Sequence, residues 1–122
     1  MASDIATDET VDLIASDRVE GTAVYNRAGE RLGKVENFMV DKVSGTARYA
    51  VLSFGGFLGM GKEHYPLPWN LLTYDSDQDG YVVDLDKSTL EGAPRYDGQS
   101  EPRFDSDYGR GIYSYYGVSY PW

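Results

Sequence analysis

The fold of this chain is decided by residues 22–54, which read TAVYNRAGERLGKVENFMVDKVSGTARYAVLSF. Three runs rich in β-branched and aromatic residues, 22–25, 31–41 and 46–54, are separated by two short segments that contain glycine. Such runs predict strands, and glycine supplies the positive φ that a tight turn needs. The stretch therefore predicts two successive β-hairpins.

The second of these strands has one break in its alternation. Leu32 and Val35 are three residues apart, whereas Phe38 and Val40 are two apart. A β-bulge inserts one extra residue into a strand in this way and bends it. We therefore expect a bend near residues 36–37.

The rest of the central region continues the β pattern. Residues 63–67 and 81–85 predict two further strands, and residues 69–72 and 87–92 predict single helical turns. Strands joined by short connections, with no long helices between them, are typical of barrels and sandwiches. The sequence predicts an all-β fold, a small antiparallel β-barrel with short helical turns.

The chain divides into four segments. We expect a mobile acidic N-terminus at residues 1–12, a barrel domain at 13–93, a polar linker with two prolines at 94–102 and an aromatic tail at 103–122. The tail has apolar residues at helical spacing, although two glycines weaken a helix there by about 1 kcal/mol each. We take as candidate interaction residues of the tail Phe104, Tyr108, Ile112, Tyr115, Tyr116 and Trp122. Their apolar area predicts that this partly helical tail docks on a surface.

A glycine-rich loop at residues 55–61 carries three large apolar side chains, Phe57, Leu58 and Met60. Apolar side chains in such a loop either pack under the barrel or contact a partner. Both alternatives remain open from the sequence, and the three residues are further interaction candidates.

An acidic segment has the spacing of a calcium-binding loop. Asp75, Asp77 and Asp79 alternate before Gly80, and Asp86 stands at the twelfth position. Calcium prefers such oxygen ligands, but an EF-hand also needs flanking helices, and aspartate and glycine are common in hairpin turns. The sequence leaves a calcium site and a turn as alternatives.

The charge balance bears on the class of partner. Twenty acidic residues against eleven basic ones give a net charge of −9, which repels phosphate backbones, so we expect no nucleic-acid partner. No uncharged stretch reaches the roughly 20 residues that span a bilayer, so we expect no membrane insertion. The first 20 residues lack a basic start followed by an apolar run, which predicts a cytoplasmic protein.

Catalytic patterns are weak in this sequence. It contains no cysteine and one histidine, His64, and nothing places a serine and a carboxylate beside that histidine. Abundant carboxylates alone do not indicate a general acid. We predict a protein that is not an enzyme and that needs no cofactor.

A family resemblance rests on hairpin and strand positions. They are Val24-Tyr25, residues 29–35, Val40-Asp41, Gly45, residues 49–52 and residues 66–69. This pattern resembles the PRC-barrel family, whose fold occurs in the cytoplasmic part of the photosynthetic reaction centre H subunit and in a ribosome maturation factor. The tail is similar to tails of stand-alone bacterial members. The resemblance implies an all-β barrel that acts as an interaction module.

These observations predict a non-catalytic protein-interaction or scaffold module. The apolar surface beyond the barrel predicts self-association as a homodimer, together with an unknown protein partner. One alternative is a calcium-responsive protein that uses the segment from Asp75 to Asp86. Another, implied only by the resemblance to the H subunit, is an accessory role in photosynthetic electron transfer.

Overall fold

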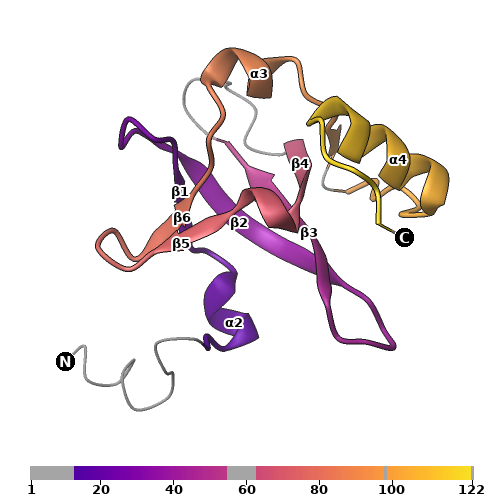
Figure 1. The fold of residues 1–122 in the computed structure, drawn as a ribbon, viewed down its shortest axis with the longest axis horizontal. Coiled ribbons are helices and arrows are strands. Elements are labelled where there is room, and N and C mark those ends of the chain that lie inside the picture. The colour runs from indigo at the N-terminus through magenta and orange to yellow at the C-terminus, as the bar shows by residue number, and fades with distance from the viewer. Residues whose placement is uncertain (1–12, 55–62, 98, 122) are drawn as a thin grey trace.

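The computed structural model describes residues 13–54, 63–97 and 99–121, which form one sheet with short helices around it (Figure 1). The strands are β1 (Ala23–Tyr25), β2 (Arg31–Val40), β3 (Ala47–Ser53), β4 (Glu63–Pro68), β5 (Thr73–Asp75), β6 (Gly80–Val82) and β7 (Tyr96–Asp97). The helical segments are α2 (Ser16–Val19), η2 (Trp69–Leu71), α3 (Lys87–Glu91) and α4 (Ser106–Tyr115). The chain is mostly β, as the sequence predicts.

The sheet is mixed, with the order β5-β6-β1-β2-β3-β4-β7. Five of its neighbouring pairs are antiparallel, but β1 and β6 are parallel, so the prediction of a wholly antiparallel sheet is wrong at this pair. Alternation and turn residues predict only hairpins between successive strands, whereas the β1–β6 pair joins segments far apart in the sequence. Within the described part of the chain no pairing joins β5 to β7, and the sheet is open there.

The bend expected in β2 is confirmed. The register with β3 shifts between Val35 and Asn37, and the carboxylate of the intervening Glu36 accepts a hydrogen bond from the Ser53 hydroxyl at 2.6 Å. Before the shift, β2 pairs mainly with β1, and after it only with β3. Gly33 of β2 lies against β3, and a Cβ at this position would collide with the Ser53 carbonyl. The bulge therefore curls the sheet around one interior.

The main core fills this interior with buried, mostly aliphatic side chains. Its members are Val19, Val24, Leu32, Val35, Ala50, Leu52, Phe54, Tyr65, Leu67, Tyr81, Val83, Leu90 and Ala93. They come from β1 to β4, from β6 and its continuation, and from the short helices α2 and α3. Strands β1 to β4 and β6 thus supply inward residues, as half-buried strands do, and β5 and β7 supply none.

The C-terminal helix α4 lies beside the sheet near β3 and β4, away from α2 and the β5–β6 hairpin (Figure 1). Its start is fixed by Asp105, whose carboxylate accepts a hydrogen bond from the Tyr108 amide at 3.0 Å. Gly117, with a φ of +71°, turns the chain after its end. None of the helices in the described residues is long and apolar enough to cross a membrane.

Candidate functional site

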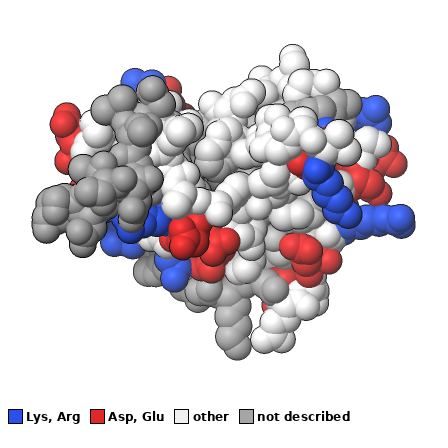
Figure 2. Space-filling model, turned by 90° about the horizontal axis from the view of Figure 1, so that it is seen from below, with Lys and Arg blue, Asp and Glu red and all other residues white. Residues whose placement is uncertain are grey.

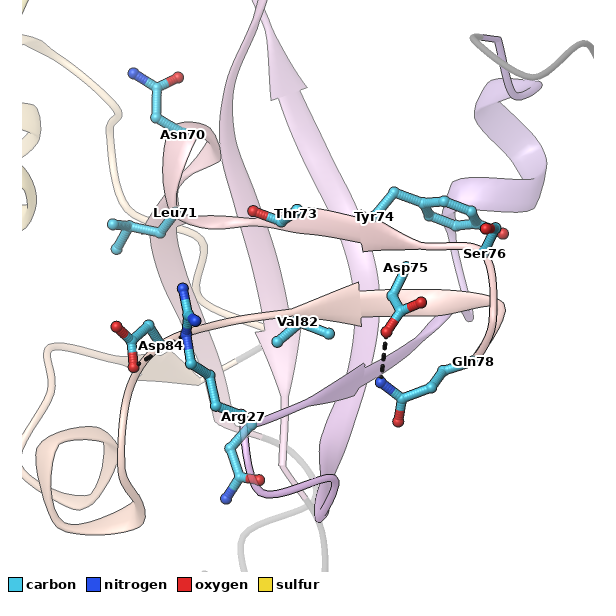
Figure 3. A pocket seen from close by; sticks show the side chains of 11 residues that line it. Arg27, Asn70, Leu71, Thr73, Tyr74, Asp75, Ser76, Gln78, Val82 and Asp84 are labelled. Atoms are coloured by element: carbon cyan, nitrogen blue, oxygen red, sulfur yellow. Dashed lines mark hydrogen bonds and ion pairs between the residues drawn. The ribbon is translucent and has the colours of Figure 1, made fainter.

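An open cleft lies over the β5–β6 end of the sheet and has a volume of about 570 Å³. Figure 3 shows Arg27 and Asp84 at one end, Asp75 and Gln78 at the other, and Val82 between them. The remaining lining residues are Asn26, Asn70, Leu71, Thr73, Tyr74 and Ser76. The lining consists of three apolar side chains and a rim of amide, hydroxyl and charged groups. This composition suits a polar ligand or a peptide segment.

The charges of the cleft are largely satisfied within the protein. Arg27 and Asp84 form an exposed ion pair at 3.4 Å. The pKa of Asp75 is lowered, first by the hydrogen bond from the Gln78 side chain, at 2.9 Å, and then by the Asp77 amide. Because hydrogen bonds to the ionised form hold this carboxylate charged, it is not poised to donate a proton. The cleft can bind a ligand by hydrogen bonding, and its Asp75 is not an activated acid.

The first three calcium candidates form an ordinary hairpin turn between β5 and β6. Asp75 pairs with Gly80 across the hairpin, and its backbone carbonyl accepts the Gln78 amide at 3.2 Å. The Asp75 carboxylate accepts the Asp77 amide at 2.9 Å, and Asp79 adopts a φ of +51°. These are the roles for which turns select aspartate.

The fourth candidate, Asp86, has a different structural role. It caps the N-terminus of α3, accepting hydrogen bonds from the Thr89 amide at 3.0 Å, the Thr89 hydroxyl at 2.7 Å and the Ser88 hydroxyl at 2.9 Å. Strand β6 lies between Asp86 and the turn, so the structure does not bring the four aspartates together. Within residues 13–54, 63–97 and 99–121, no group of three or more acidic or histidine side chains is placed to hold a metal ion.

The face of the molecule seen in Figure 2 carries mixed charges. Asp and Glu side chains form two groups across its lower middle, Lys and Arg lie beside them and towards both sides, and the upper middle carries neither. Oppositely charged side chains at the surface form ion pairs, such as Lys87 with Glu30 at 3.3 Å and Arg95 with Glu63 at 3.6 Å. This face presents no continuous basic surface among the described residues, as a phosphate backbone would require.

A second apolar cluster lies on the exterior of the sheet, and we call it the outer aromatic cluster. Its buried members are Tyr49, Ile112 and Tyr113, with Met39, Phe104, Tyr108, Tyr116, Val118 and Tyr120 packed against them. Tyr49 of β3 is central, with edge contacts to the rings of Phe104 at 5.2 Å and Tyr113 at 5.6 Å. Of the six tail candidates, the structure thus brings Phe104, Tyr108, Ile112 and Tyr116 together.

Tyr113 and Gly109 fix how α4 sits on the sheet. The Tyr113 hydroxyl donates to the Arg48 carbonyl at 2.8 Å, just beyond Tyr49, where the pairing of β3 with β4 ends. Gly109 is buried against Tyr49 and Tyr120, and a Cβ there would collide with the Tyr49 hydroxyl and lie 2.6 Å from the Tyr120 ring. Burial raises the pKa of both Tyr49 and Tyr113 to about 12. The helix therefore rests on a close, specific contact.

The end of α4 joins the cluster to the domain. The Tyr115 hydroxyl donates to the Thr89 carbonyl at 2.6 Å, although 41% of the residue is exposed. Tyr116 packs against both the main core and the outer aromatic cluster, and burial raises its pKa above the usual tyrosine range. These two residues tie the tail to α3 and to the interior.

A family model, the PRC-barrel domain, matches residues 12–90, well over half of the chain. The chain belongs to the PRC-barrel family. No curated protein matches it. The PRC-barrel match includes the whole sheet except the two-residue β7, and it ends before the linker and α4. In this PRC-barrel protein, the helix and most of the outer aromatic cluster are therefore additions to the family domain.

Some predicted interaction residues cannot be placed. Phe57, Leu58, Met60 and Trp122 lie outside the described residues. The outer aromatic cluster also contains two buried residues that are not among the sequence candidates: Tyr49, which lies in β3, and Tyr113, which stands off the spacing that predicts the helix. The signal for Tyr49 was present: with residues 50–54 it gives β3 apolar side chains on both faces, so that its outer face needs a cover.

Proposed function

We propose that this chain is a non-catalytic protein-interaction module of PRC-barrel type that associates with copies of itself. One observation carries the proposal: a helix outside the family domain is held against the exterior of the sheet by its own apolar cluster. The main core is a separate cluster, built almost wholly from the family domain. The exterior of the domain is therefore a surface suited to binding an aromatic helix.

The described titratable groups support a non-catalytic role. His64 packs edge-on to the Tyr96 ring at 5.5 Å, which is a packing contact. The pKa values of Asp41, Asp75 and Asp86 are lowered by the hydrogen bonds that stabilise turns and a helix cap. A general acid at neutral pH needs a raised carboxyl pKa, which is the opposite shift.

Solution mass tests the self-association. Light scattering of the full chain over a range of concentrations should show a species of twice the 13.6 kDa chain mass. A Val43→Ser variant controls for the β2–β3 hairpin, where Val43 is 96% exposed and offers another apolar contact. A mass of one chain at every concentration would contradict the proposal, and a loss of the dimer in the control variant would move the interface to the hairpin.

The cleft supports a second, heterologous contact. Its mostly polar lining with three apolar side chains suits a peptide segment of a protein partner, and its lining residues lie at the β5–β6 end of the sheet, whereas α4 lies elsewhere (Figure 1). A photo-crosslinking residue at Thr73, in the cleft, should capture a partner chain in cells. The same residue at Ser44, exposed at the hairpin tip, is the control. Equal capture from both positions would count against the cleft.

A further inference from the structure

The exterior of the sheet around β3 has the composition of a docking face for a helix. Met39 and Tyr49 are paired across β2 and β3 and point to the same outer side, where the Arg48 carbonyl accepts the Tyr113 hydroxyl. We call these three residues the outer docking face. In this structure its occupant is α4 of the same chain, so the shape and chemistry of a fitting partner are known.

The fit between this face and α4 is specific. Ile112 is 2% exposed and Tyr113 is 1% exposed, so both are fully buried by the contact and its surroundings. The Tyr113 hydroxyl satisfies the Arg48 carbonyl at 2.8 Å, a bond that a wholly apolar helix would leave unmade. Because Gly109 has no side chain, the Tyr49 hydroxyl can lie directly against the helix. A partner must therefore supply an amphipathic helix with a small residue, an aliphatic residue and a tyrosine at this spacing.

The segment that connects the domain to α4 allows the helix to bind to a second copy of the chain. Residues 94–105 lie beyond the family domain; β7 within them pairs with β4, and the residues that follow it, 99–105, are mostly exposed. Apart from Tyr116, the residues of α4 and its cluster make no part of the main core. The helix can thus leave its own sheet once Tyr116 withdraws from the main core and Tyr115 from the Thr89 carbonyl, and the buried members of the main core stay in place.

We propose that the outer docking face binds α4 of a second copy, so that two chains assemble by exchanging their C-terminal helices. A second copy is the partner that carries this same helix, and an exchanged helix makes the contacts that the resident one makes. The proposal rests on the self-association proposed above and names its interface. Because the linker keeps the resident helix at high effective concentration, exchange should grow with protein concentration.

Two glycines of α4 provide a matched test. A Cβ at Gly109 collides with Tyr49 and Tyr120, whereas a Cβ at Gly111 meets nothing within 4 Å. Full-length Gly109→Ala protein, whose own helix docks poorly, should bind a labelled peptide of residues 103–121 saturably, as measured by fluorescence anisotropy. The Gly111→Ala peptide should bind at least as well, because alanine favours the helix, and the Gly109→Ala peptide about tenfold more weakly.

The host protein is checked by circular dichroism, and full-length Tyr113→Phe protein is a milder second host, since it keeps the ring and removes the hydroxyl that bonds the Arg48 carbonyl. No binding of the unaltered peptide by either folded host would overturn the proposal. Equal affinity of the Gly109→Ala and Gly111→Ala peptides would also overturn it, because binding would then not use this contact.

The oligomeric state distinguishes the proposal of helix exchange from the proposal of self-association. An excess of the unaltered peptide should dissociate the full-length dimer, and Gly111→Ala should leave its mass unchanged. A dimer that resists both the peptide and the Gly109→Ala substitution would overturn helix exchange and leave self-association standing. A chain that stays monomeric at every concentration would overturn both.

Discussion

The main core and the outer aromatic cluster bury apolar surface in different ways. Val35, Leu52 and Leu67 in the main core are fully buried, and most of their neighbours are aliphatic. The outer aromatic cluster contains one buried aliphatic residue, Ile112, among tyrosines whose hydroxyls need partners. Aliphatic burial is non-directional, whereas a tyrosine contact depends on ring geometry and on a hydrogen bond.

This difference indicates which part of the molecule can be altered separately. The main core belongs to the family domain, and its loss removes the whole sheet. The outer aromatic cluster adds one helix to one face through a close approach at Gly109. A cluster of this kind can open and re-form while the sheet stays folded, as an exchangeable contact requires.

The largest effect should come from the main core. Leu52→Ala removes a fully buried side chain from β3 and leaves a cavity. We expect the free energy of unfolding to fall by about 2–5 kcal/mol, the usual range for such substitutions. Urea denaturation followed by circular dichroism measures it, and a loss below about 1 kcal/mol would show that the interior is loosely packed.

Ile112→Ala is the corresponding substitution in the outer aromatic cluster. We expect a smaller loss of about 1–2 kcal/mol, because the helix can undock before the sheet unfolds. Hydrogen exchange should show faster exchange of the α4 amides with β2 and β3 still protected. Equal acceleration throughout the sheet would mean that the two clusters unfold together and that the comparison does not hold.

Alkaline pH should also act first on the tyrosine cluster. The pKa of Tyr49 and of Tyr113 is raised to about 12, mainly by burial, from an ordinary value of about 10. The folded state thus favours the neutral hydroxyls, and their contribution to stability is present below pH 10 and is lost as the pH rises towards 12. Tyrosinate absorbance and urea unfolding at each pH measure this. An Ile112→Ala chain should lose less stability over the same range.

The smallest effect should come from calcium. Asp75 and Asp86 already accept hydrogen bonds in a turn and in a helix cap, on opposite ends of β6. Millimolar calcium should therefore leave the melting temperature unchanged, since residues 13–54, 63–97 and 99–121 hold no cluster of carboxylates that would bind it in the folded state alone. A rise in Tm that is lost in an Asp77→Asn, Asp79→Asn double variant would restore the calcium hypothesis.

Local patterns predicted much of this structure because they act through near neighbours. The 22–54 hairpins, the bend at Glu36 and the helical stripe of the tail are all present. The alternating aspartates predicted either a calcium site or a turn, because such residues serve turns and caps as readily as they bind an ion, and the structure places Asp75 and Asp77 in a turn. In each of these segments, residues near in sequence determine the local conformation. The alternative interpretations of a segment differ only in its contacts with residues far away in the chain.

The sequence by itself determined the strands, their turns, the β-rich class and the presence of a tail with apolar area to bury, since each depends on backbone preference or side-chain periodicity. Only the tertiary structure decided the parallel β1–β6 pair, the separation of Asp86 from the Asp75 turn, and the seating of α4 against Tyr49. These depend on contacts between residues far apart in the chain, whose geometry no local pattern encodes. The tail's affinity for a sheet exterior is therefore a property of the fold.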